Sequence, residues 1–250
     1  MLEICVDSLP SARAAIAAGA DRLELCSALA VGGLTPYTAL LRQIRAESHI
    51  PIRCLMRHRA GDFLYSPEEI DLLCLQIAEL RQAGADGFVI GCLTADGALD
   101  KAAMKPLIEA CGGLGITLHR CIDVSADPEQ TWLDAMELGI DTILTSGAAS
   151  SCTAGMETIR KLISLRDAHN GPEVLIGAGV NAQVISRFLA EVPGARAFHM
   201  SGKTEIESGM RFRREGVPMG LPGLDEFSVW QTDVEKVREA ARVLKGASVC

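Results

Sequence analysis

One short joint occurs three times in the chain and constrains its fold more than any other feature. It reads Ala-Gly-Ala-Asp at 18–21 and at 83–86, and Leu-Gly-Ile-Asp at 138–141. Each glycine follows an apolar helical pattern and precedes a short run of β-prone residues, as in a left-handed helix cap that turns into a strand. Three such joints at comparable places indicate that one strand–helix unit is repeated along the chain.

The pattern between these joints predicts eight such units. Short β-like runs alternate with amphipathic helical stretches. Thr35, Ser66 and Asp127 each precede a proline, and each is expected to cap a helix that starts at that proline. The predicted strands cover 2–5, 22–26, 52–56, 87–91, 116–120, 142–144, 174–176 and 197–199. The predicted helices cover 9–18, 36–47, 67–83, 101–111, 128–138, 155–168, 182–190 and 233–244.

Eight strand–helix units in 250 residues match the size and rhythm of a closed barrel. We therefore predict an α/β fold, a single (β/α)8 TIM-type barrel domain over residues 1–250. An open doubly wound sheet is the alternative, but no G-x-G-x-x-G follows the first strand. The segment 201–232, between the last strand and the last helix, is predicted to be a long loop, and such loops are often functional.

Composition narrows the class of protein. A net charge of -8 argues against a nucleic-acid-binding face. No signal peptide is apparent and no apolar run approaches the roughly 20 residues that span a bilayer, so we expect a cytoplasmic protein without a membrane partner. Nine cysteines without a C-x-x-C pair argue against a disulfide framework or a zinc ribbon. Most are expected to be structural or unassigned: Cys54, Cys74, Cys92, Cys111 and Cys152, with Cys250 expected to be exposed.

The motif Leu-Glu-x-Cys occurs on the first two predicted strands. It places Glu3 and Cys5 in one phase, and Glu24 and Cys26 in the same phase of the next strand. Alternate side chains of a barrel strand point inward, so we expect the two glutamates in one interior layer and the two cysteines in the layer above. Two neighbouring thiols suit Cu(I). The alternative is that both cysteines only fill space.

Two arginines follow the third strand. Arg57 and Arg59 are candidate anion-binding residues, because guanidinium groups bind carboxylate or phosphate in a forked geometry. The alternative is internal pairing, of Arg57 with one of the buried glutamates and of Arg59 with Asp62.

The fifth strand ends in the best catalytic candidates. His119 is expected to point inward and to move a proton near neutral pH, with Asp123 orienting a base or binding a ligand and Arg120 binding an anion. The alternative for His119 is a satisfied core histidine. His199, on the eighth strand, is a weaker candidate, and the alternative for it is a helix-facing or structural role. The candidate catalytic residues are Glu3, Glu24, His119 and Asp123.

The turns after the last three strands are rich in small residues. Such turns expose backbone N–H groups, and in these barrels phosphate often sits near the loops of strands seven and eight. The same residues also occur simply where a turn is tight. The candidate anion-binding residues of these turns are Ser146, Gly147, Gly179 and Ser201.

Six segments in order give the sequence a resemblance. LEICVDS, GADRLELCSALAVGGLTP, RHRAGDFLYSPEEI, LHRCID, ILTSG and SGMRFR together resemble the CutC copper homeostasis protein family. The resemblance implies an eight-stranded β/α barrel, a cytoplasmic homo-oligomer (dimer or tetramer), and Cu(I) binding at Cys5 and Cys26. Two departures from the family pattern, His58 and Cys121, add soft ligands at the predicted rim.

Two functions are compatible with these residues. The first is a copper homeostasis protein that binds Cu(I) through cysteines at the barrel mouth. The second is a TIM-barrel enzyme of lyase, isomerase or aldolase type that acts on a small anionic or phosphorylated metabolite through the Glu/Arg/His/Asp cluster. A pure scaffold fits poorly with so polar an interior.

Overall fold

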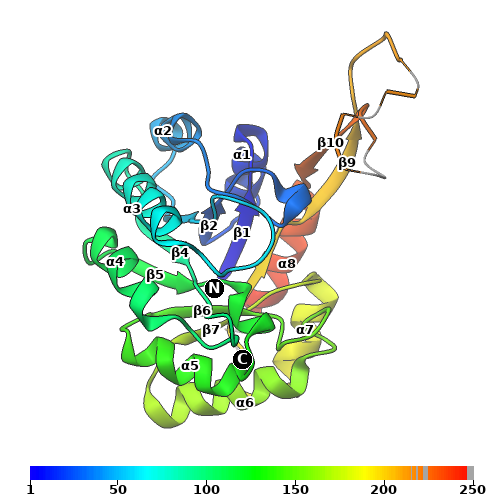
Figure 1. Ribbon diagram of the computed structural model, residues 1–250. Coiled ribbons are helices and arrows are strands. Elements are labelled where there is room, and N and C mark those ends of the chain that lie inside the picture. The colour runs from blue at the N-terminus through cyan, green and yellow to red at the C-terminus, as the bar shows by residue number, and fades with distance from the viewer. Residues whose placement is uncertain (215, 218, 222–224, 247–250) are drawn as a thin grey trace.

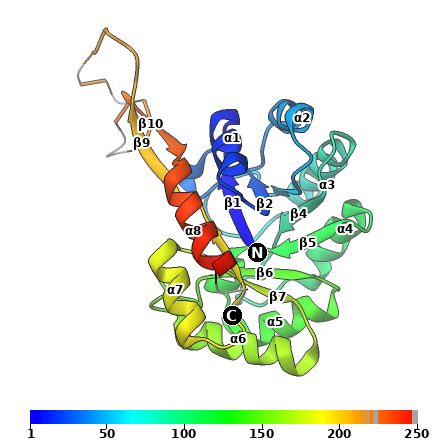
Figure 2. The ribbon, with the colours of Figure 1, turned by 180° about the vertical axis from the view of Figure 1, so that it is seen from behind.

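The protein is a closed barrel of parallel strands in the order β1 to β8, with the helices outside it (Figures 1 and 2). The computed structural model describes residues 1–214, 216–217, 219–221 and 225–246. The predicted (β/α)8 barrel is confirmed, and every predicted strand is present with ends shifted by one or two residues. The barrel strands are β1 Leu2–Val6, β2 Arg22–Leu25, β3 Ile52–Leu55, β4 Gly87–Ile90, β5 Gly115–Leu118, β6 Thr142–Thr145, β7 Glu173–Ile176 and β8 Ala197–Met200.

In the described part of the chain eight α-helices follow the strands, as predicted. Two short 3-10 helices, η1 Leu29–Val31 and η2 Arg120–Val124, lie in the loops after β2 and β5. The α-helices are α1 Leu9–Ala17, α2 Thr38–Glu47, α3 Pro67–Gln82, α4 Lys101–Cys111, α5 Pro128–Glu137, α6 Met156–His169, α7 Ala182–Glu191 and α8 Val234–Gly246.

Successive side chains of each barrel strand point alternately to the helices and to the barrel axis, and the two sides pack differently. On β1, Leu2, Ile4 and Val6 belong to the large apolar core that the helices cover. Residues of the opposite phase face the barrel axis, where two small apolar clusters accompany buried polar groups. These clusters are Cys26 with Leu55 and Val89, and Leu144 with Leu175 and Ala197.

The three repeated joints have a shared geometry. Gly19, Gly84 and Gly139 have φ angles of 92°, 100° and 75°, which confirms the left-handed turn. The aspartate that ends each joint accepts a hydrogen bond from an N–H at the start of the preceding strand, its first residue in β1 and β3 and its second in β5, so each joint is tied to the barrel. The pairs are Asp21 with Leu2 at 2.6 Å, Asp86 with Ile52 at 2.8 Å and Asp141 with Ile116 at 2.6 Å.

Two of the three predicted helix caps are confirmed, at Ser66 and Asp127. The third is wrong, because α2 begins at Thr38. Thr35 is held by the main chain of Arg57 instead: its N–H donates to the Arg57 carbonyl at 2.8 Å and its Oγ1 accepts from the Arg57 N–H at 3.0 Å. These bonds keep Thr35 beside the end of β3, one turn before the helix.

The segment 201–232 was predicted to be a long loop, but part of it forms strands. It contains β9, Lys203–Glu207, and β10, Ser228–Thr232, paired antiparallel with Trp230 opposite Glu205. This hairpin projects away from the barrel (Figures 1 and 2). Its strands lie too far apart in sequence to give a turn signal, so only their pairing identifies them.

Two further findings concern the chain as a whole. No helix in the described part of the chain is long and apolar enough to cross a membrane. All cysteines in that part are free, and most are buried. Cys250 lies outside the described residues.

Candidate functional site

A cavity of about 560 Å³ opens at the carboxyl ends of the barrel strands. It is the end of the barrel at which such folds carry their sites. The predicted site residues that line it are Cys5, Glu24, Arg57, His119, Arg120, Asp123, Gly179 and Ser201. Those that do not line it are Glu3, Cys26, Arg59, Ser146 and Gly147.

The predicted layers of two glutamates and two cysteines are wrong. The register of β1 and β2 places Glu24 opposite Cys5, while Arg22 lies opposite Glu3. Neighbouring strands of a closed barrel are staggered along the axis. The Leu-Glu-x-Cys motif of β2 is therefore offset by two residues from that of β1, and a carboxylate meets a thiol.

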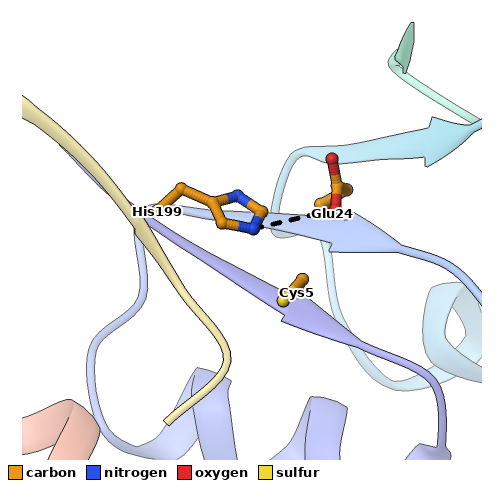
Figure 3. Close-up of side chains that lie close together, drawn as sticks. All are labelled: Cys5, Glu24 and His199. Carbon is orange, nitrogen blue, oxygen red and sulfur yellow. Dashed lines mark ion pairs between the residues drawn. The ribbon is translucent and has the colours of Figure 1, made fainter. Parts of the chain in front are cut away.

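His199 completes a cluster with this pair. One ligand atom each from Cys5, Glu24 and His199 lies within 4.8 Å of the other two, and Figure 3 shows the three side chains converging from β1, β2 and β8. On its sequence alone His199 is a weaker candidate. The structure places it facing the barrel interior, because Glu3 pairs with His199 in the β1–β8 register.

Glu3 lies fully buried beneath the cluster. Its Oε2 accepts from Arg22 Nε at 2.5 Å and its Oε1 lies 2.8 Å from His199 Nδ1. Burial alone raises the pKa of Glu3, but the hydrogen bond with His199 and the charge of Arg22 outweigh it and lower the pKa to about 2. Glu3 is thus a fixed carboxylate that holds the imidazole.

Glu24 has the opposite environment. Burial raises its pKa to about 7, despite the nearby charge of His199. Its Oε2 lies 3.8 Å from His199 Nε2, and its buried Oε1 has no hydrogen-bond partner among the described residues. Burial lowers the pKa of His199, but Cys5, Glu24 and Glu3 together raise it well above its usual value.

Cys26 is not part of this cluster. Its side chain is fully buried, and its Sγ donates to the carbonyl of Val6 at 3.5 Å. Burial, with the nearby Cys5 and Glu24, raises the pKa of Cys26 well above its ordinary value. Cys121, expected as a soft ligand at the rim, is also fully buried and is not among the residues that line the cavity.

His119 lines the cavity but is held as a neutral ring. Its Nδ1 accepts from the Cys121 N–H at 3.1 Å, and its ring centroid lies 4.6 Å from that of Phe63. Burial, followed by the charge of Arg57, lowers the pKa of His119 to about 3. The expected titration near neutral pH is therefore wrong, because the low-dielectric site and a nearby cation both oppose protonation.

The turn predicted to bind an anion after β6 binds a carboxylate of the protein itself. Asp123 accepts from the N–H groups of Ser146 and Ala148, at 2.9–3.1 Å, and from Thr145 Oγ1 at 2.5 Å. Arg120 Nε donates to the same carboxylate at 2.7 Å. Asp123 thereby uses the donors that a free anion would need.

The two arginines after β3 have different roles. Arg59 pairs with Asp62 at 3.0 Å, as the alternative predicted, and with Glu69 at 2.6 Å. His58 also bonds to Glu69, at 2.8 Å, so it is not a free rim ligand. The predicted pairing of Arg57 with Glu3 or Glu24 is wrong, since Arg22 pairs with Glu3 and Arg57 donates to backbone carbonyls.

Comparison with known proteins shows the family of the chain. The sequence profile of the CutC family matches residues 1–204. The chain belongs to the CutC family. The copper homeostasis protein cutC homolog of Homo sapiens is 39% identical over 250 residues, all of this chain and 90% of the relative. The family protein CutC of Pasteurella multocida is 38% identical, over 95% of this chain and 96% of the relative.

Solved structures place this CutC protein among the same barrels. CutC from Streptococcus agalactiae superposes with a TM-score of 0.74 and 27% identity, covering 80% of this chain and 98% of that one. A phosphoribosylanthranilate isomerase from Thermotoga maritima gives a TM-score of 0.54 at 13% identity, covering 98% of each chain. At that identity the likeness shows the fold alone.

Proposed function

We propose that this CutC protein binds copper, as Cu(I), at Cys5 and His199, with Glu24 beside them. The observation that carries the proposal is the convergence of these three side chains within 4.8 Å at the edge of one cavity. The human relative is named as a copper homeostasis protein, which supports copper as the ion.

The donor chemistry of the cluster fits copper. Thiolate and imidazole are soft enough for Cu(I). Glu3 holds His199 at Nδ1, so Nε2 is the atom that would bind an ion once it has lost the proton that Cys5, Glu24 and Glu3 favour on the ring. Metal-binding histidines commonly donate their other N–H to a carboxylate in this way. Binding at these two ligands would release two protons, one from the Cys5 thiol and one from His199. Glu24 has a buried oxygen without a partner among the described residues and a pKa of about 7, so it is suited to accept one of them, while the other passes to solvent.

Cys26 remains in the proposal as an alternative second ligand. It would have to give up its hydrogen bond to Val6 and ionise a thiol whose pKa is raised by burial. His199 must also lose a proton, but it keeps its contact with Glu3 when Nε2 binds, so we rank His199 above Cys26.

An anaerobic Cu(I) competition titration tests the proposal with single variants. Cys5→Ser and His199→Gln should each weaken binding by about 10-fold or more, as expected for loss of a ligand. Cys26→Ser should stay close to the wild type, as should the control Cys74→Ser, which lies away from the cavity. Equal losses in Cys5→Ser and Cys26→Ser would favour the two-thiol site. Weak, identical binding in all variants would refute copper binding at this cavity.

A second candidate function is acid–base catalysis on a small anion. The observation that favours it is that Glu24, with a pKa of about 7, shares the cavity with Arg57. The test is incubation of the metal-free protein with carboxylated and phosphorylated metabolites, followed by NMR. Conversion that is lost in Glu24→Gln would support an enzyme, and no conversion would refute it for that panel.

The cellular location and the oligomeric state of the protein are also matters of proposal. Free thiols on all described cysteines suit a reducing compartment, so we propose that the protein acts in the cytoplasm. The homo-oligomer implied by the family resemblance stays a prediction.

A further inference from the structure

We propose that the cavity beside the Cys5–Glu24–His199 cluster is a binding site for a small organic anion, anchored by Arg57. The anion carries a carboxylate or phosphate group on an apolar body. This inference is independent of copper binding, and it supplies the ligand class that the second candidate function requires.

Arg57 carries a charge that the protein does not neutralise. Among the described residues, no carboxylate lies within ion-pair distance of it, whereas Arg59 pairs with Glu69 and Arg120 pairs with Asp123. Its effect is felt inside the cavity, where its charge adds to burial in lowering the pKa of His119. A partly buried cation without a counter-ion favours an anionic ligand.

The guanidinium group of Arg57 is fixed and still has donors to offer. Nη1 donates to the carbonyls of Val31 and Gly33, at 2.9 and 3.0 Å, and Nη2 donates to that of Gly61 at 2.9 Å. A guanidinium has five N–H donors, so two are left, and one of these, on Nε, is buried without a described partner. The carbonyls orient the group without cancelling its charge.

The other charged groups of the cavity leave a positive excess. Arg120 and Asp123 cancel as an ion pair, and His199 faces Glu24. Lys203 also lines the cavity, and its Nζ lies 3.1 Å from the centre of the Trp230 ring rather than at a carboxylate. In a chain of net charge -8, such an excess is local and concentrates anions.

The cavity walls define the rest of the ligand. The Phe63 ring lies 5.4 Å from Cζ of Arg57, so an apolar surface adjoins the cation. A volume of about 560 Å³ is in the range that holds a metabolite-sized molecule. The apolar side chains that line the cavity include Leu29, Val31, Leu55, Phe63, Leu144 and Met200.

Ligand-observed NMR on the metal-free protein tests this site with matched probes. Benzoate and phenyl phosphate each carry an oxyanion on an apolar ring, while benzamide has nearly the shape of benzoate without its charge. We expect one or both anions to bind and benzamide to bind at least about 10-fold more weakly, as expected for loss of a charged hydrogen bond. The relative affinities of benzoate and phenyl phosphate distinguish a carboxylate ligand from a phosphate ligand.

Substitutions identify the anchor. Arg57→Gln should lower the affinity for the anion by about 10- to 100-fold. The affinity of Arg57→Lys should lie between those of Arg57→Gln and the wild type, and the exposed control Arg187→Gln should bind as the wild type does. Cu(I) affinity of Arg57→Gln should be unchanged, which separates failure of this inference from failure of copper binding. If neither benzoate nor phenyl phosphate binds the wild type more tightly than benzamide does, the inference is overturned even if Arg57→Gln does not fold. Undiminished anion binding in a folded Arg57→Gln protein would also overturn it.

Discussion

His199 Nδ1 lies 2.8 Å from Oε1 of Glu3, although 196 residues separate them in the chain. The contact exists because β8 pairs with β1 to close the barrel. It orients the imidazole so that Nε2 faces Glu24, on the side of the cavity. The same strand pairing therefore closes the barrel and assembles the candidate site.

Replacing Glu3 by Gln should destabilise the protein and disturb the site. The substitution leaves the buried Arg22 without its carboxylate, and loss of one partner of a buried pair costs about 3–5 kcal/mol. It also removes a group that raises the pKa of His199, so that pKa should fall. Chemical denaturation measures the first effect and histidine NMR titration the second. Glu47→Gln, at an exposed pair with Arg13, should change the unfolding free energy by less than about 1 kcal/mol.

The buried His119 should make stability depend on pH. Its folded pKa is about 3, below the roughly 6.5 of an unfolded histidine. The unfolded state therefore binds a proton that the folded state does not, and stability falls by up to about 1.4 kcal/mol per unit as pH drops from 6.5 towards 3. Unfolding free energies of wild type and His119→Gln at pH 7 and pH 5 measure this. If both proteins lose the same stability, His119 is not the group responsible.

Gly91 should not tolerate a side chain. A Cβ atom at this position would lie 2.5 Å from His119 Cε1 and 2.5 Å from Cys121 Sγ, both of them buried. Overpacking of this kind costs about 1–3 kcal/mol, so Gly91→Ala should lower the melting temperature. Gly209→Ala, where no atom lies within 4 Å of the new Cβ, should have the wild-type melting temperature.

Asp123→Asn should loosen the loop after β6. The amide would place N–H donors against the donors of Ser146 and Ala148, and it would remove the charge that pairs with Arg120. An unsatisfied buried group of this kind costs about 1–3 kcal/mol. Thermal unfolding measures the loss, and Asp62→Asn, at an exposed carboxylate, is the matched control. A variant as stable as wild type would show that Asp123 does not organise the turn.

Much of the barrel could be predicted from local signals. The joints at Gly19, Gly84 and Gly139 combine a helix end, a left-handed residue and a strand start, all within a few residues. Such signals need no knowledge of distant parts of the chain. The hairpin of β9 and β10 has no comparable local signal, and it was missed.

The site was predicted less well, because it depends on stagger between strands. The sequence indicates that Glu3, Cys5 and Glu24 face the barrel interior. It does not indicate how far along the barrel axis each residue lies, and this position places Glu24 beside Cys5. His199 had a usable signal: Phe198 and Met200 beside it are apolar and face outward, so His199 faces inward. The hydrogen bonds from the turn after β6 to Asp123 are tertiary contacts, which no local sequence pattern indicates.

In the proposed site one thiol and one imidazole hold copper. X-ray absorption spectroscopy of the protein loaded with one Cu(I) under anaerobic conditions identifies the ligand atoms. We expect one sulfur and at least one nitrogen scatterer, with the sulfur signal lost in Cys5→Ser and kept in Cys26→Ser. Two sulfur scatterers and no nitrogen would refute this site, and would establish Cys5 and Cys26 as the ligands instead.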